Sequence, residues 1–251
     1  MTEAMAAEFD TVAEWTAEVA ADLGIAYHIP AGCRGSGTPA ALDWLLGHLD
    51  LAPGEAFLDC GAGVGGPAAY AVQQRAVRPV LVEPEAGACR AARDLFGYPV
   101  LRAVASALPI ADESFGAAWS LGVLCTMRDQ LSLLTELRRV VRPSGYIGML
   151  AFVARNLAED EQPKGNNFPT VDLLQNLVER AGLRIEAWRS TADLPSAPPD
   201  WEHRVDIVDS ELRGRHSGKP AWQMAEQQSE LIARLLGKSA VTGELLVLRR
   251  R

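Results

Sequence analysis

Apolar residues change their spacing along the chain in a regular way. Residues 56–60 and 79–82 are short apolar runs typical of buried strands, whereas residues 67–74 and 86–95 have the spacing of helices. The same alternation continues to residue 190 and predicts a mostly parallel sheet covered by helices on both faces. The other expected strands are 100–104, 115–121, 146–153 and 184–190, and the other expected helices are 8–23, 39–49, 130–141 and 170–181.

The last sixty residues depart from this rhythm. A proline-rich connector at 192–199 is followed by two helical patterns, 201–213 and 221–236, and by a final strand at 241–248. This strand is expected to pair antiparallel with the strand at 184–190, with the two helices inserted between them. The predicted fold is α/β, doubly wound and Rossmann-like, with a mostly parallel seven-stranded sheet whose last strand is antiparallel.

Composition and charge narrow the class of protein. The 251 residues are 48% hydrophobic and 22% charged, which is ordinary for a globular chain with a sizeable core. The formal net charge of −8 argues against a nucleic-acid partner bound through its phosphates. The first ten residues lack the apolar stretch of a signal peptide, and no run is long enough for a membrane span.

The four cysteines are scattered and form no Cys-x-x-Cys pair. They are expected to be free thiols, which favours a cytoplasmic location and argues against a structural metal site. Their positions are Cys33, Cys60, Cys89 and Cys125.

The clearest chemical signal is the stretch from Phe57 to Gly66, where an apolar strand ends in Asp59 and breaks at once into glycines. Such a turn lets bare backbone and a helix N-terminus approach a ligand closely. Its glycines also satisfy the Gly-x-Gly-x-x-Gly pattern of dinucleotide sites. Asp59, however, would repel a pyrophosphate and could accept from an ammonium group. Glu83, at the end of the next strand, is placed to hold ribose hydroxyls.

Three motifs in this order resemble those of class I S-adenosylmethionine-dependent methyltransferases. Residues 58–65 resemble the family's first motif, residues 108–115 its Leu-Pro-Phe…Ser-Phe-Asp segment, and residues 134–145 its Leu-x-Pro-Gly-Gly turn. The resemblance covers roughly residues 51–153. It implies a domain over 51–251 with inserted helices at about 192–240, and an N-terminal helical lid over 1–50.

The resemblance also implies which residues contact S-adenosylmethionine. In order from methionine to adenine, they are the backbone of Gly61 and Gly63 with Asp59 for the amino group, Leu121 and Gly122 beside the sulfonium, Glu83 on the ribose, and Pro84, Ala105 and Ser106 around the adenine. One departure is Val104, which stands where the family often has an aspartate.

The acceptor side is less specified, because methyl transfer needs mainly positioning and a base only if the acceptor must lose a proton. The candidate catalytic residues are Tyr27 and His28 in the lid and His203 in the inserted helices, the last as general base. Arg34 is expected to meet a ligand carboxylate and is grouped with the cofactor-binding residues. The simpler interpretation makes all four ordinary surface residues.

Two further segments have possible chemistry. In the polar loop 159–169, Asn166 and Asn167 could hydrogen-bond an acceptor, and the acidic run at 159–161 is more typical of a solvated loop than of a metal site. Cys125 would act as a nucleophile only with a lowered pKa. No metal site is therefore predicted.

The predicted function is methyl transfer from S-adenosylmethionine to a small molecule of the natural-product or lipid-precursor type. No nucleic-acid or membrane partner is expected, and the oligomeric state is left open, with a homodimer as one option. The first alternative is a protein of the same fold that uses the sulfonium for a rearrangement or cyclisation. A nicotinamide-dependent oxidoreductase and a non-enzymatic binding subunit are the others.

Overall fold

Seven strands form one sheet in the computed structural model, which describes residues 7–158 and 161–251. The strand order is β3-β2-β1-β4-β5-β7-β6. Neighbouring pairs are parallel from β3 to β5, and β7 is antiparallel to both β5 and β6, which confirms the predicted fold. The strands are β1 Ala56–Cys60, β2 Arg78–Glu83, β3 Val100–Arg102, β4 Phe115–Leu121, β5 Val141–Ala154, β6 Leu183–Ser190 and β7 Val241–Arg250.

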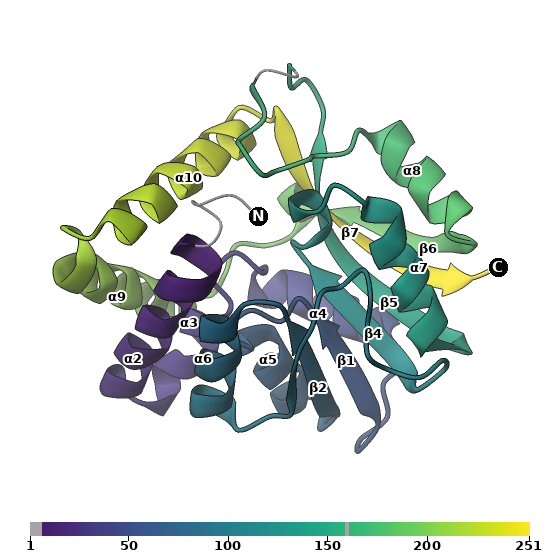
Figure 1. Cartoon of the computed structure of the whole chain (residues 1–251), viewed down its shortest axis with the longest axis horizontal. Helices are drawn as coiled ribbons and strands as arrows, with labels where there is room; N and C mark the ends of the chain where they lie inside the picture. Colours follow the sequence, from purple (N-terminus) through teal and green to yellow (C-terminus); the bar gives the residue numbers. More distant parts are fainter. Residues whose placement is uncertain (1–6, 159–160) are drawn as a thin grey trace.

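Helices surround the sheet (Figure 1). Short or irregular helical segments are η1 Ala7–Val12, η2 Ile25–Tyr27, α3 His28–Gly32, η3 Leu124–Thr126 and η5 Thr191–Asp193. The longer helices are α2 Ala13–Leu23, α4 Pro39–His48, α5 Gly66–Arg75, α6 Ala86–Phe96, α7 Gln130–Val140, α8 Val171–Arg180, α9 Pro199–His216 and α10 Pro220–Gly237.

The alternation of side chains along β1 explains why helices cover both faces. Phe57 packs in a buried cluster with Leu42 and Leu45 of α4, whereas Leu58 packs in a second cluster with Leu134 of α7 and other buried residues. Both β1 residues have no exposed surface. Because successive strand residues point to opposite faces, a continuous apolar run requires cover on each side.

The inserted helices lie beside the N-terminal ones. Figure 1 shows α9 and α10, which follow β6 in the chain, grouped with α2 to the left of the sheet. A separate apolar cluster joins them, with Val19 of α2, Val208 of α9 and Trp222 of α10 among its buried members. The insertion between the last two strands is therefore confirmed, and it packs on the start of the chain.

Two local predictions differ from the structure. A turn is expected at residues 142–145, but β5 already begins at Val141, and Phe115 pairs with Val141 while Ala117 pairs with Tyr146. The extra residues bulge out of the strand while the backbone on either side stays paired with β4. The helix α3 is not predicted by the sequence, because its Pro30 and Gly32 are typical helix breakers.

The acidic run of the polar loop includes Glu159 and Asp160, which lie outside the described residues, as do the first six of the chain. The chemistry considered for that run therefore stays a prediction.

Candidate active site

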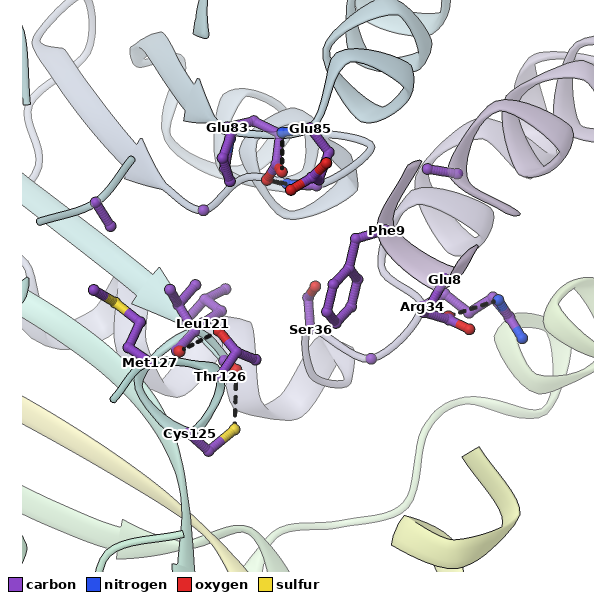
Figure 2. A pocket seen from close by; sticks show the side chains of 18 of the residues that line it. Glu8, Phe9, Arg34, Ser36, Glu83, Glu85, Leu121, Cys125, Thr126 and Met127 are labelled. Carbon is purple, nitrogen blue, oxygen red and sulfur yellow. Dashed lines mark hydrogen bonds and ion pairs between the residues drawn. The ribbon is translucent and has the colours of Figure 1, made fainter. Parts of the chain in front are cut away.

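A cavity of about 610 Å³ lies at the carboxyl ends of β1, β2 and β4 (Figure 2). Gly61 and Gly63 follow β1, Glu83 ends β2, and Leu121 ends β4, and all four line the cavity. The opposite wall comes from η1, α2 and α10. In open α/β sheets, ligands bind in this crevice outside the carboxyl ends of the strands.

The glycine loop needs residues without a side chain. Gly61 has a φ of +80°, and a Cβ placed there would collide with the side chain of Val123. Gly65 has a φ of +90° and precedes α5, which begins at Gly66. Positive φ values are unfavourable for residues with a Cβ, so glycine is strongly favoured in this turn. Without side chains, the backbone of the turn is exposed to the cavity.

Glu83 is fixed by this loop. It is only 6% exposed; its Oε2 accepts a hydrogen bond from the backbone N–H of Gly63 at 2.9 Å, and its Oε1 accepts from that of Glu85 at 3.1 Å. Burial raises the pKa of Glu83 to about 7. The two backbone hydrogen bonds lower this pKa, and the nearby charges of Glu85 and Asp10 raise it. Each oxygen retains a lone pair that can accept from a ligand hydroxyl.

Asp59, on β1 just before the glycine loop, is 1% exposed and is not part of the cavity wall. Its Oδ2 has no hydrogen-bond partner within the described ranges 7–158 and 161–251. Burial raises the pKa of Asp59 to about 7, and the charge of Glu83 contributes to that rise. A cation bound above the loop would favour the ionised carboxylate.

The structure brings together most of the residues predicted to bind the cofactor. Besides the glycines and Glu83, the cavity is lined by Pro84, Ala105, Ser106, Leu121, Gly122 and Arg34. Val104, the departure from the family pattern, also lines it and is 53% exposed.

Arg34 lines the cavity and is paired with two protein carboxylates. Its Nε donates to Asp209 Oδ1 at 2.9 Å and its Nη1 to Glu8 Oε1 at 3.3 Å. Its guanidinium carbon also lies 5.9 Å from the ring centroid of Trp222. Two protein carboxylates balance the charge of Arg34, and its contact with a ligand carboxylate stays a prediction.

The structure places none of the three candidate catalytic residues on the cavity wall. The His28 ring packs edge-on against Phe96 with centroids 6.2 Å apart, and Tyr27 packs on the apolar cluster around Trp222. His203 is exposed on α9. The physical reason is the unpredicted η2–α3 segment, which directs Tyr27 and His28 into helix packing instead of the cavity.

Several lining residues are not singled out by the sequence as site residues. Phe9 is 41% exposed and lines the cavity, and Figure 2 shows it next to Ser36, between Glu8 and Thr126. Its helical spacing with Val12 is typical of a core residue, so the sequence holds no signal for this position. The same is true of Glu8 and Gln228, which line the cavity from η1 and α10.

Asn166, Asn167 and Cys125, the other residues with possible chemistry, have different surroundings. Asn166 lines the cavity, whereas Asn167 uses its backbone to bind Cys125 and Gln130. The Cys125 thiol donates to the Gly122 carbonyl at 3.2 Å, and burial raises its pKa to about 12. A neutral buried thiol of this kind is a poor nucleophile.

Comparison with known proteins supports the predicted family over part of the chain. Residues 58–149, which hold Asp59, the glycine loop, Glu83 and β4, match the family model described as "Methyltransferase domain". Over these residues the chain matches a methyltransferase domain, and its sheet has the Rossmann-like fold of methyltransferases.

Among curated proteins, the methyltransferase domain is similar to Methyltransferase GfsG of Streptomyces halstedii, with 28% identity over 158 residues, 56% of this chain and 57% of the relative. The chain spans about half the length of the curated relatives it matches.

Solved structures share the fold. The [4+2]-cyclase SpnF is 21% identical, with a TM-score of 0.66 over 83% of this chain and 79% of that one. The geranyl diphosphate C-methyltransferase from Streptomyces coelicolor A3(2), solved with Mg²⁺, geranyl diphosphate and S-adenosyl-L-homocysteine, is 16% identical, with a TM-score of 0.58 over 84% and 79%.

Proposed function

We propose that this protein transfers a methyl group from S-adenosylmethionine to a small-molecule acceptor. The observation that carries the proposal is the pairing of Gly63 with Glu83 at 2.9 Å on the wall of a 610 Å³ cavity. Exposed backbone and a buried carboxylate with spare lone pairs suit an amino-acid end and a ribose, and the carboxylate disfavours a pyrophosphate.

The residues on the cavity wall suit the chemical groups of the cofactor. We assign the Gly61 and Gly63 backbone to the methionine part, Glu83 to the ribose hydroxyls, and Pro84 with Ala105 and Ser106 to the adenine. Asp59, whose Oδ2 lacks a partner in the described part of the chain, favours the ammonium group from beneath the loop. When bound, the cofactor supplies an activated methyl group.

The protein's own contribution is to hold the acceptor close and exclude water. Phe9, Phe152, Phe168 and Ile232 give part of the cavity wall an apolar surface. The helical segment from η1 to α4 is proposed to act as a lid over this wall. The small-molecule acceptor follows from the enclosed shape, since a cavity of this size suits a ligand of a few hundred daltons better than a macromolecule.

The proposal is tested with isotope-labelled cofactor. Purified protein is incubated with S-adenosyl-[methyl-¹³C]methionine and a small-molecule extract, and the mixture is analysed by mass spectrometry. Label in a small molecule together with stoichiometric S-adenosylhomocysteine is the expected result. A boiled sample is the control for chemical methylation.

The alternative retained from the sequence uses the same cofactor without transfer. It gains support from the similarity to a protein named as a [4+2]-cyclase. It predicts that a substrate is converted while no S-adenosylhomocysteine forms, which the same experiment detects.

Location and assembly stay predictions. The sequence favours a cytoplasmic location and leaves a homodimer as one option. No helix in residues 7–158 and 161–251 is long and apolar enough to cross a membrane.

A further inference from the structure

Arg34 joins three elements at the wall of the cavity. Its Nε donates to Asp209 Oδ1 of α9 at 2.9 Å, and its Nη1 donates to Glu8 Oε1 of η1 at 3.3 Å. Its guanidinium carbon lies 5.9 Å from the ring centroid of Trp222, a buried residue of α10. Arg34 and Glu8 line the cavity, whereas Asp209 and Trp222 do not. One side chain on the cavity wall is therefore in contact with η1 and with both inserted helices.

The three contacts depend on a single guanidinium. The side chains of Arg34, Glu8 and Asp209 are all partly exposed, and an ion pair at such a site is individually weak. Removing Arg34, however, removes all three contacts at once, together with the cation that Glu8 pairs with. Burial raises the pKa of Glu8, and the charge of Arg34 opposes that rise. The place of η1 in the cavity wall therefore depends more on Arg34 than on Asp209.

Phe9 connects this ion pair to the interior of the cavity. It follows Glu8 directly in η1, and it is an exposed aromatic residue that lines the cavity. Figure 2 shows the Phe9 ring next to Ser36, between the Glu8–Arg34 ion pair and Thr126. Because Glu8 and Phe9 are neighbours in one helical turn, a change in the position of Glu8 also displaces the Phe9 ring.

We propose that Arg34 is a positioning residue, which fixes the Phe9 ring on the acceptor side of the cavity by tying η1 to α9 and α10. Asp209 acts through Arg34, since it does not line the cavity itself. The helix α9, all of whose residues are described and none of which lines the cavity, thereby helps to set the cavity's shape. This inference rests on the proposed function, because it takes the apolar part of the wall to receive the methyl acceptor.

Hydrogen–deuterium exchange of the ligand-free full chain tests the tie between α9 and η1. We expect Arg34→Met to speed amide exchange across residues 7–16 at least tenfold, because all three contacts are lost, and Asp209→Asn to speed it about threefold, because one is lost. In the double variant, Asp209→Asn should add nothing to Arg34→Met. Arg34→Lys keeps the charge without the planar fork that reaches two carboxylates, so its exchange should lie between those of the wild type and Arg34→Met.

The matched control is Asp22→Asn. Asp22 of α2 also pairs with a residue of α9, Arg215, but both side chains lie away from the cavity wall. The substitution removes the same charge and one ion pair between the same parts of the chain. It should leave exchange across residues 7–16 as in the wild type.

A fluorescence titration tests the part played by Phe9. The probe is N-phenyl-1-naphthylamine, which is uncharged and aromatic, and it is titrated into the full chain saturated with S-adenosylhomocysteine. The wild type is expected to bind the probe, and Arg34→Met to bind it at least threefold more weakly, because the displaced ring no longer packs on it. In a Phe9→Ala background, Arg34→Met should no longer change the affinity. A general loss of stability would lower the affinity in both backgrounds.

The outcomes separate this inference from the proposed function. If Asp209→Asn exchanges like the wild type, or has its full effect in the Arg34→Met background, the tie through Arg34 is refuted; Arg34→Lys replaces Arg34→Met if the latter does not fold. If the wild type takes up no probe, or the effect on probe binding does not depend on Phe9, the positioning of Phe9 is refuted. In these cases S-adenosylhomocysteine still binds and the methyltransferase proposal stands. If S-adenosylhomocysteine does not bind, the proposed function fails, and exchange alone decides on the tie.

Discussion

Gly61 shows how one residue limits what the site can hold. Its backbone adopts a φ of +80°, and a Cβ there would overlap Val123. The next glycine of the motif differs, because Gly63 has a φ of +54° and open space around it. A side chain at Gly61 is thus disfavoured by both the backbone conformation and the neighbouring Val123, whereas at Gly63 only the backbone conformation disfavours it.

We therefore expect Gly61→Ala to weaken S-adenosylhomocysteine binding at least tenfold, since strain of about 1–3 kcal/mol must be relieved by moving the loop. Calorimetry measures the affinity and thermal unfolding measures the stability. Gly47→Ala is the control: Gly47 lies in α4, and the methyl group that the substitution adds would have nothing within 4 Å, so binding should stay unchanged. Wild-type affinity in Gly61→Ala would contradict the assigned role of this loop.

The two buried carboxylates predict how stability depends on pH. Burial raises the pKa of Asp59 from 3.8 to about 7 and that of Glu83 from 4.5 to about 7. Between these values the folded state binds more protons than the unfolded state, so the free energy of unfolding falls as pH rises. Urea unfolding of the ligand-free protein should thus show lower stability at about pH 8 than at about pH 5.5.

Asp59→Asn should flatten this dependence, because an amide of the same shape cannot titrate. Asp43→Asn, which changes a carboxylate bound to Tyr70 away from the cavity, is the comparison. A pH dependence that is equally steep in Asp59→Asn and in the wild type would show that Asp59 is not the group responsible.

At the scale of elements, the N-terminal segment is tied to the rest of the site by ion pairs and a hydrogen bond. Asp10 of η1 accepts from the backbone of Gly87 at the start of α6, and Glu14 of α2 pairs with Arg90 at 2.6 Å. Arg34 links Glu8 to Asp209 of α9. These contacts are partly exposed and individually weak, so a lid built from them can open.

Hydrogen–deuterium exchange tests the lid. Adding S-adenosylhomocysteine should slow amide exchange across residues 7–23, because a ligand beneath η1 removes the solvent that its opening admits. The helix α8, 171–180, lies on the other side of the sheet and serves as the internal control. Equal exchange in η1 and α2 with and without ligand would contradict a lid that closes over the cofactor.

Some elements can be predicted from the residue pattern and others cannot. The β1–loop–α5 unit is predictable because a buried strand, a carboxylate and glycines follow one another without interruption, and local chemistry alone dictates the turn. Tyr27 and His28 do not line the cavity, and the sequence could not show this because the direction of a side chain in a short segment depends on what that segment packs against. Phe9 escapes prediction for the same reason, since its helical spacing is equally compatible with a core and with a cavity wall.

At the scale of the whole molecule, the site is formed by parts that are distant in the chain. The sheet supplies the loop and the carboxylates, the start of the chain supplies Phe9 and Glu8, and the insertion between β6 and β7 supplies Gln228. The sequence could identify the first part by its motifs, whereas the other two depend on the packing of α2 against α9 and of η1 against α10. The sequence therefore predicts the cofactor-binding part of the cavity better than the acceptor-binding part.

The most direct test of the account is calorimetric titration of S-adenosylhomocysteine into the full chain near pH 8, where Asp59 and Glu83 are mostly ionised. We predict one binding site per chain, and at least tenfold weaker binding in Glu83→Gln, because an amide accepts less strongly from ribose hydroxyls. Glu202→Gln, an exposed position on α9, should bind as the wild type does. A folded wild-type protein that takes up no S-adenosylhomocysteine would contradict the central claim.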